Sequence, residues 1–319
     1  MSSSAHANDE TMPAPGDLAM GQMGMWLFLG TEVMFFAALI ATYLILCSSV
    51  AGQDGSGWPT AAQVHMNPWI GLGNTAILLV SSVLVSLAVQ ALAAGAGKRA
   101  GNLLLLAMGL GVCFLGIKGY EYSGKFRHQL LPGKIGEVFP AGSTIARRYD
   151  QGPGLQWLDS LKAPLEELGG KEFRLATGKE KGADPAAATQ TLQAVRQDPA
   201  KNLAYEILLS LEKGEATPSV AARKVFGANE AIRAAGGSTE VPVPPALPHG
   251  NLWASCYFVI TGLHATHLLA GLVALGIPAL AGVFGYLKPS SLGYLTNAAL
   301  YWHFVDLVWI ILFPLLYLV

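Results

Sequence analysis

The residues of this chain whose type and position suit chemistry are ionisable side chains inside long apolar segments. The last such segment places His303 and Asp306 three residues apart in the run Tyr301 to Trp309 (YWHFVDLVW). An ionisable side chain at the centre of a bilayer costs about 2.5 to 3.5 kcal/mol on insertion scales, so it normally faces other helices and has partners there. The spacing of this pair fits a proton relay, but without a nucleophile nearby we predict a mutual hydrogen bond between two buried groups.

The first and third apolar segments carry further charged residues. Glu32 is the only charged residue of the first segment; it either handles protons or lipid, or forms an interhelical hydrogen bond that orients the bundle. Lys118 and Glu121 lie three apart near the end of the third segment, on one helical face, and can pair. Because snorkelling lysines are common at the edge of the hydrocarbon, we predict that this pair is an interfacial anchor.

The fourth apolar segment contains two histidines on one helical face, in the run Thr261 to Gly271 (TGLHATHLLAG). Neutral imidazoles ligate haem iron, so His264 or His267 together with His303 could clamp a haem between the last two segments. The alternative, which we favour, is hydrogen bonding to a neighbouring helix or a lipid headgroup. No nucleophile triad, nucleotide loop or Cys/His metal box occurs in the sequence. We therefore predict no catalytic, cofactor-binding or metal-binding residue in this chain.

Composition indicates a membrane protein, because 52% of the residues are hydrophobic and 13% are charged. The net charge of −1, with both signs mixed, excludes a nucleic-acid partner. A helix needs roughly 20 apolar residues to span a bilayer. Five segments are long enough: 20–47, 68–93, 102–124, 250–285 and 292–318. The predicted fold class is therefore all-α: a polytopic membrane helix bundle with five transmembrane helices and a mostly helical soluble insert.

The placement of charge predicts the domain organisation. Of the 41 charged residues, 30 lie between Lys125 and Leu247. We predict a polar N-terminal tail, three transmembrane helices, an extra-cytoplasmic insert and two further transmembrane helices, at 1–19, 20–124, 125–247 and 248–319. The tail lacks the features of a cleaved signal peptide, so the first helix should remain a span. Basic residues in the loops after the second and fourth spans put the N-terminus in the cytoplasm and the insert and C-terminus outside.

The insert carries signals for helix ends. Three pairs place an N-cap side chain before a proline: Asp184-Pro185, Asp198-Pro199 and Thr217-Pro218. Leucines from Leu158 to Leu168 form an apolar stripe, which we predict to be interrupted at Pro164.

Four motifs, one in each of four spans, resemble those of the cytochrome c oxidase subunit 3 family of haem-copper terminal oxidases. Two are the runs Tyr301 to Trp309 and Thr261 to Gly271; the others are Trp26 to Phe36 (WLFLGTEVMFF) and Gly111 to Tyr122 (GVCFLGIKGYEY). Their order is specific to the family, and they cover the membrane part but not the insert. The chain is similar to a short five-helix form of the family that lacks the first two helices.

The resemblance implies a noncatalytic subunit that carries no redox metal, with haems and copper in partner subunits. Such subunits pack on the catalytic subunit I, hold phospholipids and support proton uptake. By this likeness Glu32, His303 and Asp306 are buried polar residues related to proton movement. Thr261, His264 and His267 are candidates for lipid contact. Lys118 stands where many relatives have a neutral glutamine, so the role of that helix does not transfer.

We therefore expect subunit III of a proton-pumping cytochrome c oxidase in aerobic respiratory electron transport. Its partners would be subunit I, subunit II and phospholipids, with an electron-donor cytochrome at the insert, in a bacterial inner (plasma) membrane. One alternative is a b-type membrane cytochrome that uses the histidines of the last two spans. Another is a transporter or proton channel built around Glu32, Lys118 and Asp306, although the sequence shows no internal repeat.

Overall fold

The computed structural model describes residues 15–50, 57–140, 142–179, 185–236 and 240–318. Among these residues, five helices are long and apolar enough to cross a membrane, which confirms the predicted fold class. They are α1 (Pro15–Val50), α2 (Pro68–Ala93), α3 (Gly97–Arg127), α9 (Gly250–Val283) and α10 (Leu292–Tyr317). Because α1 is described from Pro15, residues 15–19 of the predicted polar tail are helical.

The chain divides into two compact units, which we describe separately. The membrane unit comprises Met1–Leu44, Met66–Tyr122 and Tyr257–Val319, and the insert unit comprises Ile45–His65 and Ser123–Cys256. The insert unit thus includes part of the segment between the first two spans. The domain boundaries drawn from the sequence stay a prediction.

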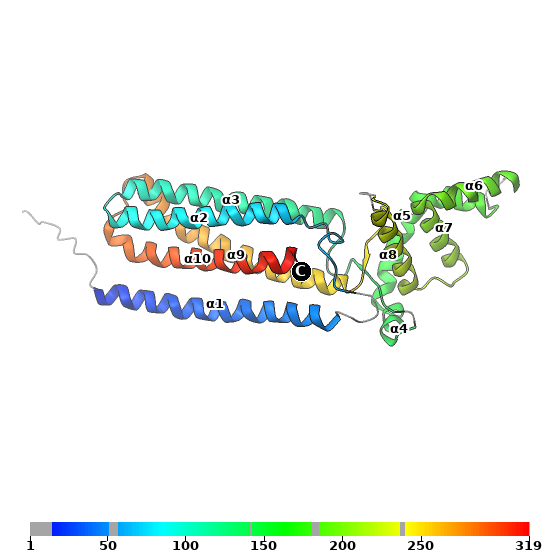
Figure 1. Cartoon of the computed structure of the whole chain (residues 1–319), viewed down its shortest axis with the longest axis horizontal. Helices are drawn as coiled ribbons and strands as arrows, with labels where there is room; N and C mark the ends of the chain where they lie inside the picture. Colours follow the sequence, from blue (N-terminus) through cyan, green and yellow to red (C-terminus); the bar gives the residue numbers. More distant parts are fainter. Residues whose placement is uncertain (1–14, 51–56, 141, 180–184, 237–239, 319) are drawn as a thin grey trace, which may run out of the picture. The chain divides into compact units, whose positions relative to one another are not determined.

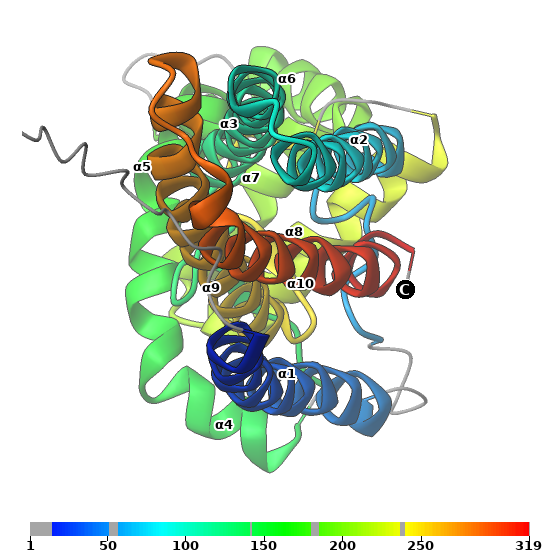
Figure 2. The same ribbon diagram turned by 90° about the vertical axis from the view of Figure 1, so that its left-hand side faces the viewer.

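The membrane unit is a bundle in which α9 and α10 lie between α1 on one side and α2 and α3 on the other (Figure 1, Figure 2). Its helices begin where local chemistry predicts. At the start of α2, the side chain of Asn67 accepts a hydrogen bond from the backbone N–H of Trp69 at 2.9 Å, and Pro68 occupies the first turn. A short 3₁₀ helix, η1 (Pro289–Ser291), precedes α10.

Two glycines allow α3 and α9 to approach each other closely. A Cβ atom on Gly101 would lie 2.6 Å from the carbonyl carbon of Gly282, and a Cβ atom on Gly282 would lie 2.5 Å from the Cα of Gly101. No side chain fits in that space. Small residues at such crossings let two helix backbones come into van der Waals contact within lipid.

The insert unit is mostly helical. Its helices are α4 (Thr144–Asp150), α5 (Pro153–Ala176), α6 (Pro185–Gln197), α7 (Pro199–Glu212) and α8 (Pro218–Ala234). Leu161 and Leu165 of α5, Ile207 of α7 and Val225 of α8 are fully buried in one hydrophobic core. This burial is the main reason that the unit folds, because apolar area removed from water stabilises by about 25 cal/mol per Å².

The structure tests the helix-end predictions within the insert. Asp198 and Thr217 cap α7 and α8 as predicted, each followed by proline. Asp184 lies outside the described residues. The predicted interruption at Pro164 is wrong, because α5 continues through it. A proline inside a helix removes one backbone hydrogen bond, and the buried apolar stripe of α5 offsets that cost.

A two-stranded parallel pairing joins the two ends of the insert, which the sequence did not predict. It pairs β1 (Gly136–Glu137) with β2 (Ala246–Leu247). Gly136 is required there, because a Cβ atom would collide with the ring of Trp157. The indole Nε1 of Trp157 donates to the carbonyl of Pro245 at 3.2 Å, which fixes the ring against the pairing.

The close approach of α3 and α9 gives a stability prediction. Gly101→Ala should lower the thermal midpoint of the purified chain in detergent, because overpacking costs about 1–3 kcal/mol. Gly109→Ala, on the same helix, is the matched control: no atom lies within 4 Å of its added Cβ. We expect Gly109→Ala to be neutral or to stabilise by up to about 1 kcal/mol. The thermal midpoints are measured by circular dichroism. Equal midpoints for the two variants would contradict the close contact between α3 and α9.

Candidate functional site

A buried lysine forms the most completely bonded polar cluster of the membrane unit. Lys118 of α3 is 7% exposed. Its ammonium donates to the carboxylate of Glu121 at 3.1 Å, to the hydroxyl of Tyr317 at 3.1 Å and to the hydroxyl of Tyr257 at 3.3 Å. An ammonium has three N–H donors, so every one of them has an acceptor.

The two tyrosines close the cluster by donating to the same carboxylate. The hydroxyl of Tyr257 donates to Glu121 at 2.9 Å, and that of Tyr317 donates at 2.5 Å. Aromatic rings surround the ammonium, with centroids 5.0 to 5.9 Å away: Tyr122, Tyr257, Trp309 and Tyr317. Such rings attract a cation through their negative faces. The cluster, which we call the Lys118 cluster, is thus neutral in net charge and links α3, α9 and α10.

The Lys118 cluster corrects one sequence interpretation. Lys118 and Glu121 do pair, but an interfacial anchor would extend its ammonium toward water or headgroups. Here the ammonium is turned into the bundle. The interpretation failed because Tyr257 and Tyr317, which supply the inward partners, are distant in sequence.

His303 and Asp306 are connected through a serine of α2, so the predicted mutual hydrogen bond is wrong. The imidazole Nδ1 of His303 lies 2.5 Å from the hydroxyl of Ser82, and its Nε2 lies 3.2 Å from the hydroxyl of Ser86. The carboxyl of Asp306 lies close enough to Ser82 to interact with its hydroxyl, while its Oδ1 is buried and has no hydrogen-bond partner among the described residues. Residues three apart on one helix share a face but need not touch. The result is a chain of polar groups from imidazole through hydroxyl to carboxyl.

Trp309, on the same face of α10, also contacts α2. Its indole Nε1 donates to the hydroxyl of Thr75 at 3.1 Å. The ring of Trp309 also lies 4.8 Å from that of Phe114 and 5.1 Å from that of His264, between centroids. The polar side of α10 therefore faces α2, while its aromatic side contacts α3 and α9.

Glu32 and His267 form a hydrogen bond between α1 and α9. The carboxyl Oε2 lies 3.0 Å from Nε2 of the imidazole, and the other ring nitrogen lies 2.8 Å from the carbonyl of Leu263. A carbonyl only accepts, so Nδ1 carries hydrogen. Nε2 of a neutral ring is then an acceptor, and the contact needs one proton, held either by the imidazole or by the carboxyl. The pair is thus suited to exchanging a proton without net change in charge.

The other two candidates for lipid contact are enclosed by the bundle. His264 is 1% exposed, and within the described residues its ring nitrogens have no hydrogen-bond partner. Thr261 is 2% exposed; its hydroxyl donates to the carbonyl of Tyr257 at 2.6 Å and accepts from Tyr122 at 2.5 Å. Lipid contact stays a prediction for His267, whose side chain keeps some exposed surface.

The arrangement of the histidines does not support a haem clamp. Both nitrogens of His303 contact serines of α2, and both nitrogens of His267 have partners in Glu32 and Leu263. In the part of the chain that the structure describes, no group of three or more His, Cys, Asp or Glu residues is placed to hold a metal ion.

Sequence reasoning missed the residues that complete these sites. Ser82 and Ser86 are four apart in an apolar span, which is a detectable signal, because both lie on one helical face. Tyr257 and Tyr317 sit near the ends of spans, where tyrosine is common, so their type alone gave no indication of a buried role.

Comparison with known proteins decides the family. The family model described as "Cytochrome c oxidase subunit III" matches residues 15–139 and 248–319, more than half of the chain. The chain belongs to the cytochrome c oxidase subunit III family. This confirms the resemblance found from the four motifs, and the match includes every residue of the Lys118 cluster and of the two histidine sites. Most of the insert lies outside it.

Individual subunit III proteins match over shorter stretches. The chain is 34% identical over 119 residues to cytochrome c oxidase subunit 3 of Pylaiella littoralis, which covers 37% of this chain and 43% of that protein. It is 45% identical over 69 residues to that of Synechocystis, covering 21% and 30%, and 37% identical over 100 residues to that of Arabidopsis thaliana, covering 31% and 38%. The matched part therefore spans less than half the length of these relatives.

The Lys118 cluster gives a double-mutant prediction. Lys118→Met or Glu121→Gln alone should destabilise the chain by about 3–5 kcal/mol, because each leaves an uncompensated buried charge. The double variant should lose less than either single variant, since it buries no charge. Lys98→Met, an exposed lysine of the same helix, is the control and should be near neutral. Additive losses in denaturant unfolding would contradict a coupled pair.

Proposed function

We propose that this chain is a noncatalytic subunit III of a proton-pumping haem-copper terminal oxidase, a cytochrome c oxidase of aerobic respiratory electron transport. The observation that carries the proposal is the family match on both sides of the insert, which includes all five spans. Haems and copper belong to partner subunits. The chain stabilises subunit I, its main partner, and lies in a complex that also contains subunit II.

Support for a role in proton uptake comes from two sites in the membrane unit. One is the Glu32–His267 pair, in which a hydrogen bond joins a carboxyl to an imidazole. The other is the chain His303–Ser82–Asp306, in which the serine hydroxyl can accept from one neighbour and donate to the other. These groups favour proton exchange over metal binding.

Support for lipid binding comes from the outer surface of α1 and a cavity beside it. Large apolar side chains of α1 are exposed, among them Met20, Trp26 and Met34. A cavity of about 440 Å³ opens between α1, α9 and α10, and Phe28 and Tyr301 line it. Both features suit phospholipid acyl chains, which are as apolar as these side chains.

The proposed location is a bacterial inner (plasma) membrane, with the N-terminus in the cytoplasm and the insert and C-terminus outside. Lys98 and Arg99, between the second and third spans, and Lys288, between the fourth and fifth, support this orientation by the positive-inside rule. On the outer face the insert would contact an electron-donor cytochrome.

Asp306→Asn tests the proposed role. The substitution replaces an ionisable oxygen by an amide donor beside the Ser82 hydroxyl, so proton exchange along that chain should fail. We expect the purified complex to keep its haem content, measured by its absorption spectrum. During sustained turnover, however, it should lose oxidase activity several-fold faster than the unmodified complex, or release this subunit more readily. Asp159→Asn, an exposed aspartate, is the control. Loss of haem with the subunit retained would overturn the proposal.

Replacing residues 125–247 with a short linker tests the contact with a donor. The oxidase should then need a higher concentration of reduced donor for half-maximal O2 consumption, or lose an outer subunit. Co-purification of the remaining spans with subunit I checks that the complex still assembles. If donor dependence and subunit composition both stay unchanged in an assembled complex, the insert does not contact the donor.

A further inference from the structure

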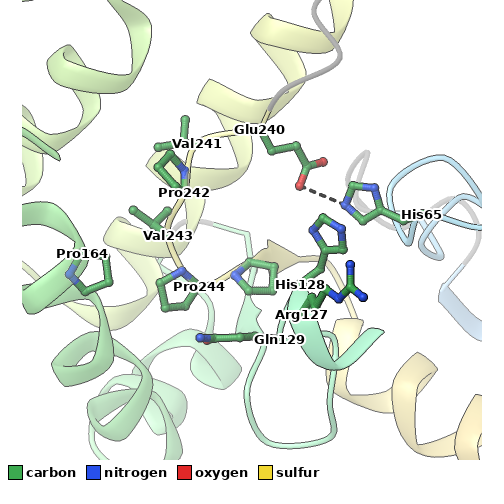
Figure 3. A pocket seen from close by; sticks show the side chains of 11 residues that line it. His65, Arg127, His128, Gln129, Pro164, Glu240, Val241, Pro242, Val243 and Pro244 are labelled. Atoms are coloured by element: carbon green, nitrogen blue, oxygen red, sulfur yellow. Dashed lines mark hydrogen bonds and ion pairs between the residues drawn. The ribbon is translucent and has the colours of Figure 1, made fainter. Parts of the chain in front are cut away.

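A cavity of about 640 Å³ lies within the insert unit (Figure 3). Polar side chains line one side: His65, Arg127, His128 and Gln129. The segment Val241 to Pro245 forms the opposite side, and three of its five residues are prolines, which have no backbone N–H. The cavity therefore has one side rich in donors and one side that presents mostly carbon.

The lining of this cavity holds one arginine, Arg127, and one carboxylate, Glu240. Within the described residues, the guanidinium of Arg127 forms no hydrogen bond or ion pair. The one carboxylate in the lining, Glu240, is already paired with Arg233 and lies 3.3 Å from Nε2 of His65. Lys125, whose ammonium donates to the carbonyl of Val64, adds a further cation nearby. An anion in the cavity would give Arg127 a partner of opposite charge.

The two histidines form a stacked pair at the same place. Their ring centroids are 4.1 Å apart, with an angle of 21° between the planes. Burial and the neighbouring Lys125 and Arg233 hold the pKa of His65 below its ordinary value, and burial, His65, Lys125 and Arg127 lower the pKa of His128. Both rings are thus neutral near neutral pH and become further N–H donors when an anion approaches.

Backbone conformation gives a second, independent indication of a site. Among the described residues, three that are not glycine have a positive φ: His65, Gln129 and His249, each at 52°. Two of the three line this cavity. Left-handed backbone at residues other than glycine costs about 1–3 kcal/mol and gathers at ligand sites, where the surrounding structure holds it.

We propose that this cavity binds a phosphoryl group. The available donors are the fork of Arg127 and the two imidazoles, whereas the side chain of Gln129 points away from them (Figure 3). A tetrahedral phosphoryl group offers three oxygens, and arginine binds it through two parallel hydrogen bonds. The proline side would contact the carbon atoms of whatever bears the phosphate.

Two sources of that group have the same chemistry. Arg127 is the last residue of α3, and His65 lies three residues before Pro68, where α2 begins. Both residues are therefore next to the end of a membrane span, so an anionic phospholipid headgroup is one source. Soluble phosphate is the other. The proposal goes beyond the proposed function, since it assigns a ligand to a cavity of the insert unit whose polar side lies within the family match and whose proline side lies outside it.

Inorganic phosphate is the probe for the test, titrated by calorimetry into the purified full chain in a neutral detergent. Arg127→Gln should weaken binding at least tenfold, and His128→Phe, which keeps a stacked ring without its nitrogens, should weaken it several-fold. Arg196→Gln is the matched control, because it removes an exposed arginine outside the cavity lining. Absence of saturable binding, or equal weakening by Arg127→Gln and Arg196→Gln, would overturn the proposal.

The pH dependence follows from the histidines, with sulfate as a probe that stays a dianion. Because their pKa is lowered in the folded chain, the empty insert loses stability as pH falls through about 6.5. A bound dianion favours the protonated rings and reverses that loss. Sulfate should therefore bind about tenfold more tightly at about pH 5.5 than at about pH 7.5. If the affinity for sulfate did not change with pH, the histidines would not take part in binding the anion.

Nanodiscs distinguish the two sources. If a headgroup occupies the cavity, phosphate should bind more weakly to the chain in phosphatidylglycerol than in phosphatidylcholine, and Arg127→Gln should abolish that difference. Equal affinities in the two membranes, with the Arg127→Gln effect retained, assign the site to soluble phosphate.

Discussion

The membrane unit depends on one constraint: a charged group buried among apolar helices is costly unless hydrogen-bond partners surround it, and most of those partners lie on other helices. The Lys118 cluster meets this constraint most fully. One ammonium, one carboxylate and two hydroxyls from α3, α9 and α10 satisfy each other with no net charge. Helices in lipid gain little from the hydrophobic effect between them, so such bonds and close packing set their arrangement.

The other polar contacts extend this logic to the remaining spans. Glu32 joins α1 to α9 through His267, and His303 joins α10 to α2 through two serines. Each contact pairs an ionisable group with a partner from a different span. At least one member of each of these contacts lies in one of the four motifs, and the proposed proton exchange would use the same bonds that hold the bundle.

The sequence predicted the spans well, because length and apolar composition determine whether a helix can cross a bilayer. It predicted two N-caps for the same kind of reason, since a cap depends on residues next to it. Partners across helices could not be predicted. Spacing suggested that His303 would bond to Asp306, but Ser82, 221 residues from His303, lies between them. Likewise, Lys118 needed Tyr257 and Tyr317, and no local pattern identifies them.

The insert unit contains chain segments from both sides of α2 and α3, which has a consequence for the order in which it can fold during synthesis. The carbonyl of Val64 leaves the ribosome 61 residues before the ammonium of Lys125 that binds it. Both α2 and α3 must be synthesised in between, and both must cross the membrane for the two groups to meet on one side. The insert unit can therefore close only after both spans have been made and inserted, so its folding follows that of α2 and α3.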